Sequence, residues 1–311
     1  MKRQLIIILL ACLPLFVAAG QNVDVRLETR AAFAVMPDDS GFQGNYLNLR
    51  INGSINDHFS YSFHHRLNKA ITDRNMFNAT DWAWIKFDNG KWGVQAGKMQ
   101  LEYGGFEFDA PVIDLYYSSE YYDRFNGAFT FGLNLIRHFK LGTLMAQVAQ
   151  SAFSESVLGG LRSYSISYRG AYGCYEWIHS INSFDVPDGS PLTSLVLGNR
   201  FTAGPAKFEL DLLQRANFNS WSWFDDVTVI ANASVKATDW MDVIAKFTYD
   251  YNRNQNDPLV PQGIRFFSYG GGFEFFPMKG SRDIRIHCLY QYFHNPAFLA
   301  GVTWKIHLLT K

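Results

Sequence analysis

The sequence predicts an all-β fold, a closed antiparallel transmembrane β-barrel of about 16 strands that follows an N-terminal signal peptide. Three observations predict it. Apolar and polar residues alternate along nearly every segment beyond residue 21. These segments are about ten residues long, which suits strands that cross a bilayer at a tilt of about 45°. Short and long connections alternate along the chain, as they do between the two rims of a membrane barrel.

Residues 1–20 have the three-part pattern of a secretory signal peptide. Residues 1–3 are basic at two positions, residues 5–19 are almost wholly apolar, and the run ends in small residues at 18–20. Cleavage there leaves residues 21–311 as one barrel domain. An uncleaved anchor is a weaker alternative, because a spanning helix needs roughly 20 apolar residues. A lipoprotein signal that ends at Cys12 is the other alternative.

The first expected strand, 22–35, shows the pattern that identifies the others. Successive side chains of a strand point to opposite faces, so alternation separates an apolar face from a polar one. Here the polar face is charged and consists of Asp24, Arg26, Glu28 and Arg30. Four similar segments follow, at 44–54, 58–68, 79–88 and 91–101.

The middle of the chain repeats the pattern over seven segments. They are expected at 126–137, 142–152, 161–170, 173–182, 192–203, 206–215 and 226–236. In the last of them, valine and alanine alternate with polar residues such as Asn232 and Lys236. Tight links such as Ala203-Gly204-Pro205 separate neighbouring segments.

The last four strands are expected at 240–252, 264–276, 282–293 and 298–309. Aromatic residues such as Tyr249 and Tyr251 end their apolar faces, as in the girdles of membrane barrels. A half-buried soluble sheet also alternates, so a secreted β-sandwich that acts as a binding module is the alternative. Strand length, aromatic ends and charged polar faces favour the barrel. Lipid then requires closure, because an open edge leaves backbone groups unpaired.

Residues 81–99 form an expected hairpin with a tight turn, whose second strand ends in the pair Gly97-Lys98. This hairpin resembles that of the phosphate-selective porin O/P-type outer-membrane proteins, especially those of Bacteroidota. The resemblance implies a trimeric porin of about 16 strands. Phosphate-selective members of this family line the pore with a dense ladder of Arg and Lys. The present sequence has no such ladder, which argues against phosphate selectivity.

The polar face of each strand is assigned to the lumen. Its expected basic residues are Arg26, Arg30, Arg50, Arg66, Arg169, Arg200, Lys236, Lys246, Arg285 and Lys305. Its expected acidic residues are Asp24, Glu28, Glu176, Glu209, Asp211, Asp242, Asp250 and Glu274. The totals are similar, so strong ion selectivity is not expected. Closure places the first and last strands side by side, which would join Arg26, Arg30, Arg50, Arg66, Arg285, His287, Lys305 and His307 into one basic wall.

The longest connection, 102–125, is the third on the outer side and is acidic. Its acids are Glu102, Glu107, Asp109, Asp114, Glu120 and Asp123. We expect this loop to fold into the lumen and to face the basic wall, because rings of fixed charge set permeability. Opposed acidic and basic walls would create a transverse field that favours small polar solutes. The alternative is that the loop stays outside with its acids solvated.

Composition and motifs exclude several other functions. Lys plus Arg equals Asp plus Glu at 28 each, which argues against nucleic-acid binding. The sequence lacks the common hydrolase, metalloprotease and nucleotide-binding motifs, so no enzyme is expected. Cys174 and Cys288 match no metal-binding spacing, so neither a metal nor a cofactor is expected.

The sequence therefore predicts an outer-membrane porin of a Gram-negative bacterium, a water-filled channel for passive diffusion of small hydrophilic solutes or anions. Its expected partners are outer-membrane lipid, these solutes and further copies in a homotrimer. A structural or adhesive barrel without an open pore is the alternative function.

Overall fold

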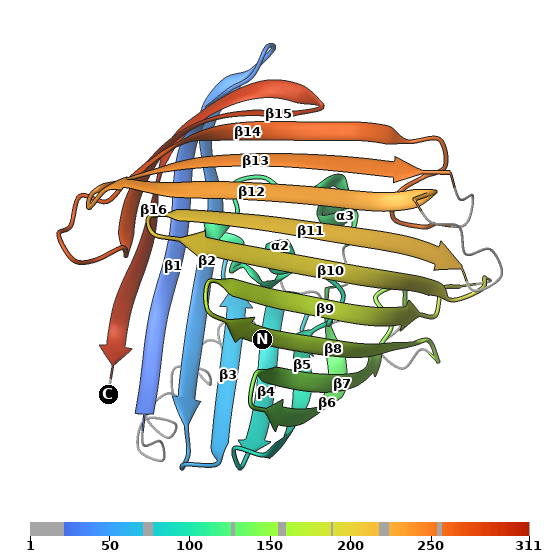
Figure 1. Cartoon of the computed structure of the whole chain (residues 1–311). Helices are drawn as coiled ribbons and strands as arrows, with labels where there is room; N and C mark the ends of the chain where they lie inside the picture. Colours follow the sequence, from blue (N-terminus) through green and yellow to red (C-terminus); the bar gives the residue numbers. More distant parts are fainter. Residues whose placement is uncertain are drawn as a thin grey trace.

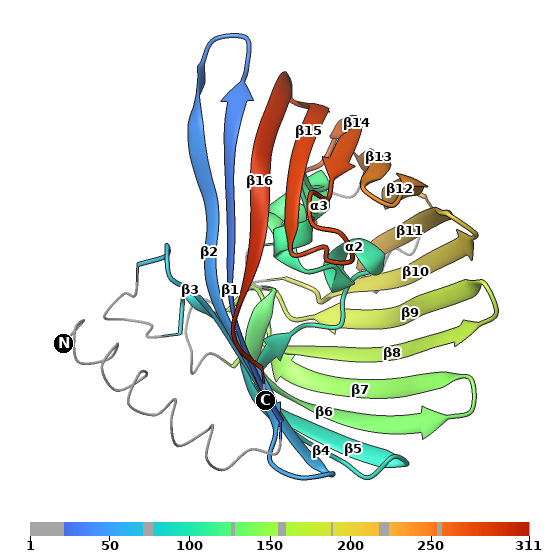
Figure 2. The same ribbon diagram turned by 90° about the vertical axis from the view of Figure 1, so that its left-hand side faces the viewer.

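The computed structural model describes residues 22–70, 77–125, 128–154, 160–187, 189–217, 224–253 and 257–310. In these residues, 16 antiparallel strands form one closed barrel (Figures 1 and 2). The expected fold class is confirmed, and the alternative of a β-sandwich is wrong because the sheet closes on itself. The signal peptide expected at 1–20 lies outside the described residues and stays a prediction.

The strands follow one another around the barrel in sequence order. They are β1 (Asn22–Val35), β2 (Ser40–Ser54), β3 (Phe59–Arg66), β4 (Thr80–Asp88), β5 (Trp92–Gln100), β6 (Phe129–Phe139), β7 (Gly142–Gln150), β8 (Arg162–Tyr172), β9 (Tyr175–Phe184), β10 (Leu192–Ala203), β11 (Ala206–Asn217), β12 (Asp226–Thr238), β13 (Met241–Asn252), β14 (Arg265–Phe275), β15 (Ile284–Phe293) and β16 (Asn295–Thr310). Each lies within a few residues of its expected position.

Strand β1 closes the barrel. Its Arg26 stands opposite Arg50 of β2 on one side and His307 of β16 on the other. Both edges of β1 are therefore hydrogen-bonded. In lipid this closure is required, because no water is present to satisfy an open edge.

The distribution of buried side chains is the inverse of that in a soluble protein. On β13 the inward face is polar, with Asp242, Lys246 and Asp250 at most 9% exposed. The outward face is apolar, with Val243 36% and Phe247 44% exposed. Exposed apolar surface that continues around many strands marks contact with a membrane rather than with water. The alternation seen in the sequence thus separates a lipid-facing side from a lumen-facing side.

The connections lie at two rims. The described chain ends and the links after even-numbered strands lie at one rim, and most of these links are short, such as 140–141 and 204–205. We call it the periplasmic rim and the opposite one the outer rim. The expected alternation of short and long connections between the two rims is wrong at two places. The links 36–39 and 294 are short and lie at the outer rim, because β2 and β16 begin earlier than expected.

The connection between β5 and β6 lies inside the barrel (Figures 1 and 2). It contains α2 (Phe106–Asp109), the 3-10 turn η1 (Val112–Asp114) and α3 (Glu120–Arg124). We call residues 101–125 the inner loop. Among the described residues, no helix has the length and apolar character needed to cross a bilayer.

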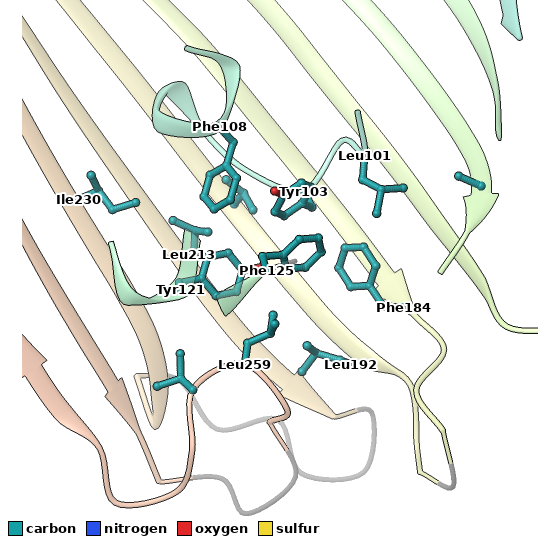
Figure 3. Close-up of a cluster of buried hydrophobic side chains, with 13 residues drawn as sticks. Leu101, Tyr103, Phe108, Tyr121, Phe125, Phe184, Leu192, Leu213, Ile230 and Leu259 are labelled. Atoms are coloured by element: carbon teal, nitrogen blue, oxygen red, sulfur yellow. The ribbon is translucent and has the colours of Figure 1, made fainter. Parts of the chain in front are cut away.

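A hydrophobic core fills part of the barrel interior (Figure 3). Tyr103, Tyr121 and Phe125 of the inner loop pack there, and the rings of Tyr103 and Phe125 stack with centroids 3.8 Å apart. Leu259 and Val260, from the outer connection between β13 and β14, belong to the same cluster. The core therefore joins two outer connections inside the barrel, on the side of β7 and β9 to β12.

Candidate functional site

Two inward-facing aspartates hold the inner loop by its main chain. Asp211 on β11 accepts a hydrogen bond from the backbone N–H of Glu107 at 2.9 Å, in α2. Asp250 on β13 accepts one from the backbone N–H of Glu120 at 3.2 Å, at the start of α3. The first N–H groups of a helix have no partner within the helix, so a carboxylate satisfies them well. Asp211 was expected to line an open pore; it is buried against the inner loop instead.

Two glycines allow the inner loop to approach the wall at Asp211. A Cβ atom on Gly105 would overlap the Asp211 carboxylate. A Cβ atom on Gly198 of β10 would lie 3.0 Å from the Cα atom of Gly105. Larger residues at either position would push α2 away from β10 and β11. The sequence pattern of the strands carries no sign of this contact.

Arginines from two further strands of the barrel bind carbonyl groups of the inner loop. Arg30 on β1 donates to the backbone oxygens of Ile113 and Leu115, the latter at 2.6 Å. Arg285 on β15 also donates to the oxygen of Ile113, at 2.7 Å. Charged donors make stronger hydrogen bonds than neutral ones. The wall thus holds the inner loop by acids at its N–H groups and by bases at its carbonyl groups.

Asp114 connects the inner loop to the expected basic wall. Its carboxylate lies 2.7 Å from Arg285 and 3.1 Å from Lys305. Burial alone raises the pKa of the Asp114 carboxyl, but the charges of Arg285 and Lys305 outweigh burial, and the pKa lies below its usual value. We expected an acidic wall and a basic wall separated by a gap with a transverse field. At Asp114 this expectation is wrong, because the acid is in direct contact with the bases.

Most other acids of the inner loop also have basic partners. Glu102 and Asp109 pair with Arg169, Glu107 pairs with Lys246, and Glu120 pairs with Arg124 and His294. Asp123 is exposed. The acids therefore fasten the loop to several strands rather than forming one acidic rim.

Tyr116 adds a neutral contact between the inner loop and the wall. Its hydroxyl donates to Glu274 on β14, and its ring lies 4.5 Å from the Arg30 guanidinium. Burial raises the pKa of the Tyr116 hydroxyl, so the group remains protonated and keeps its donor proton.

Most of the remaining expected lumen residues also have partners in the wall or in its links. Arg26 lies 2.6 Å from Asp24, Arg50 lies 3.6 Å from Glu28, and Arg66 lies 2.8 Å from Asp81. Glu209 pairs with Arg200 and Lys207, Asp242 with Arg282, and Glu274 with Arg285. The basic residues of the first and last strands do lie on neighbouring strands, but acids between them offset much of their charge.

A bulge on β4 explains an ambiguity in the sequence. Strict alternation cannot place Asp81 and Trp82 on the same face, and either choice leaves a misfit. In the structure His64 pairs with Trp82 and His65 pairs with Thr80, so Asp81 is the extra residue of a β-bulge. Asp81 binds His64 at 3.1 Å. Both Asp81 and Trp82 therefore reach the lumen.

The most deeply buried ion cluster in the described part of the chain was not expected from the sequence. Arg215 on β11 lies 2.6 Å from Asp226 and 2.7 Å from Asp257, with all three side chains at most 1% exposed. Its guanidinium also lies 4.6 Å from the ring centroid of Tyr121 in the inner loop. Arg215 lies on the same face of β11 as Asp211, so alternation along the strand could have assigned it to the lumen. Its partner Asp257 lies in an outer connection, where alternation gives no guidance.

A cavity of about 660 Å³ lies between the inner loop and the walls formed by β10 to β15. Its lining includes six basic and six acidic side chains, together with apolar and aromatic residues of the inner loop. Lys207, Lys236 and Arg282 place it toward the periplasmic rim, because they lie near the links 204–205, 239–240 and 276–283.

The fold is that of known bacterial porins. OmpT of Vibrio cholerae in a trimer form is 11% identical, with 93% of this chain and 100% of that chain covered at a TM-score of 0.61. OprB of Pseudomonas putida is 11% identical, with 94% and 96% covered at a TM-score of 0.64. The anion-selective porin from Comamonas acidovorans is 11% identical, with 91% and 98% covered at 0.61.

The sequence comparisons identify the family. No curated protein is significantly similar to the chain in sequence. The model of the family described as phosphate-selective porin O and P matches residues 18–185, which is more than half of the 311 residues. The closed barrel with its lipid-facing apolar surface and polar lumen agrees with that match. The chain belongs to the phosphate-selective porin O and P family, and it is an outer-membrane porin of a Gram-negative bacterium.

Proposed function

We propose that this porin is a narrow diffusion channel in which small hydrophilic solutes or anions pass beside the inner loop with little ion selectivity. Passive diffusion through an outer-membrane channel follows from the porin family and the closed barrel. One observation supports the narrowing. Asp211 on β11 and Asp250 on β13 hold the N–H groups of the inner loop inside the barrel, and Arg30 on β1 and Arg285 on β15 hold its carbonyl groups.

The charge arrangement supports weak selectivity. A phosphate-selective pore needs a series of basic side chains that a phosphate can bind in turn. Here Arg50, Arg66 and Arg285 already have carboxylate partners within 3.6 Å. A passing anion would have to compete with these acids. We therefore propose that the channel does not share the phosphate selectivity in the family's description.

Assembly as a homotrimer is part of the proposal. It rests on the family and on the trimer form solved for OmpT of Vibrio cholerae. The lipid-facing apolar surface would be divided between lipid and neighbouring copies. Chemical cross-linking in native membranes, followed by electrophoresis without heating, tests this part separately from conduction.

The central experiment is conductance of the full chain in a planar bilayer. We expect discrete channels and a small reversal potential in a KCl gradient, because acids offset most lumen bases. A variant that lacks residues 106–120 is expected to conduct several-fold more than the natural chain. Equal conductance of the two proteins would reject the inner loop as the constriction, and a reversal potential near the anion limit would reject weak selectivity.

A closed structural barrel is the second candidate function. The hydrophobic core inside the barrel favours it, since Tyr121, Phe125 and Leu259 fill space that a wide pore leaves to water. The same experiment separates the two. A structural barrel gives no channels, and the 106–120 deletion then creates conductance where the natural chain has none.

A further inference from the structure

The cavity between the inner loop and β10 to β15 has two chemically different sides. The inner loop contributes apolar and aromatic groups, among them Phe106, Pro111, Leu115 and Tyr117, together with three acids that have basic partners. The strands contribute charged and polar groups near the periplasmic rim, among them Lys207, Lys236 and Arg282. A pore that carries only small hydrated solutes has no need of an apolar side.

The charged side has six basic groups and three acidic ones, and the basic groups are also the more exposed. Lys207 is 45% exposed, whereas its partner Glu209 is 10% exposed. Arg282 is 56% exposed, whereas its partner Asp242 is 10% exposed. Lys236 is 50% exposed and pairs with Asp239, which lies in the turn and does not line the cavity. On this strand side, a molecule in the cavity therefore meets ammonium and guanidinium groups before it meets carboxylates.

Size is the third observation. A volume of about 660 Å³ lies within the roughly 300–1,000 Å³ of typical small-molecule sites. Such sites combine apolar walls with a few polar groups that orient the ligand. This cavity has both. It also lies inside the barrel, because the inner loop forms one of its sides.

We propose that this cavity is a binding site for small organic anions with an apolar body, such as aromatic carboxylates, which enter from the periplasmic rim. The carboxylate binds near Lys207 and Lys236, and the apolar body contacts the side chains of Leu115 and Pro111. This proposal rests on the proposed channel function in one respect: if the bound anion lies in the conduction path, it reduces the ion current.

The first test is current block in a planar bilayer with additions on the periplasmic side. Benzoate, acetate and benzylammonium are the probes, because the first two share a charge and the first and third share a ring. Benzoate should halve the current at a concentration about tenfold below that of acetate, since burial of the ring adds apolar contact. Benzylammonium should not block. Equal block by benzoate and acetate, or stronger block by benzylammonium, would overturn the proposal.

Variants assign the two sides of the site. The double substitution Lys207→Gln and Lys236→Gln should raise the half-blocking concentration of benzoate about tenfold. The double variant leaves no buried carboxylate without a basic partner, because Glu209 still pairs with Arg200 and Asp239 is exposed. Leu115→Asn should weaken benzoate block and leave acetate block unchanged. Lys279→Gln, an exposed lysine in the link 276–283 outside the cavity lining, is the matched control and should change neither.

Calorimetric titration of the detergent-solubilised protein with benzoate keeps this test independent of conduction. Saturable binding that the double variant loses supports the site even when no channels are observed, in which case only the proposed function fails. Channels without saturable benzoate binding overturn the site and leave the channel function in place.

Discussion

Arg215 and Asp257 form an ion pair of 2.7 Å that joins β11 to an outer connection inside the barrel, with both side chains fully buried. The same guanidinium contacts the ring of Tyr121 in the inner loop. One residue of the wall therefore positions two segments that come from different parts of the chain. Removing one member of a buried ion pair leaves the other charge uncompensated, so this contact controls both segments.

Substitution of Arg215 is the first prediction. Arg215→Leu leaves Asp226 and Asp257 buried without their cation and should lower the free energy of unfolding by about 3–5 kcal/mol. Asp257→Asn is milder, because Arg215 keeps Asp226, and should cost about 1–3 kcal/mol. Urea unfolding in lipid vesicles measures both. Arg253→Gln is the control. It removes an exposed ion pair in the same connection, in which the Arg253 side chain is 71% exposed, and it should have little effect on stability.

The second prediction concerns the approach of α2 to the wall. Gly105→Ala places a methyl group on the Asp211 carboxylate. It should destabilise this contact by about 1–3 kcal/mol and increase single-channel conductance. Gly44→Ala is the control, because a Cβ atom there meets no atom within 4 Å. Equal conductance in the two alanine variants would contradict the role of Asp211 in holding the inner loop.

The third prediction is a pH dependence at Asp114. Because Arg285 and Lys305 outweigh burial, the pKa of Asp114 in the folded protein is below the usual value of about 3.9. The ion pair is therefore fully present above about pH 4, and it is lost as the pH falls through the lowered pKa.

Comparison with Asp114→Asn measures this effect. The variant should conduct more than the natural chain at pH 7 and at pH 5 by the same factor. The two proteins should become alike only below about pH 4. A difference that already shrinks between pH 7 and pH 5 would mean that the pKa of Asp114 is raised rather than lowered.

The fourth prediction tests the lipid-facing side. Phe247 lies in the middle of β13 and points outward, 44% exposed. Phe247→Arg should cost about 2–4 kcal/mol of stability in lipid, because a charge at the centre of the bilayer is poorly solvated. Trp240→Arg, at the turn before β13, should cost no more than about 1 kcal/mol. Similar costs at the two positions would place the bilayer elsewhere on the barrel.

Strand β4 shows what the sequence of a single strand can predict and what only pairing between strands reveals. Alternation assigns a face to each residue only while the strand stays regular, and the bulge at Asp81 breaks that rule. Neither neighbour of Asp81 in the sequence signals the extra residue. The pairing of His64 with Trp82, made across two strands, reveals it.

By itself, the sequence determined the barrel, the strand positions and the division between lipid and lumen, because strand geometry repeats every two residues and lipid demands closure. Only the tertiary structure decided which charges meet. Arg30 binds the oxygen of Leu115 across 85 residues of chain, and Asp211 binds the N–H of Glu107 across 104. Such contacts depend on how the inner loop crosses the lumen, which no local period encodes.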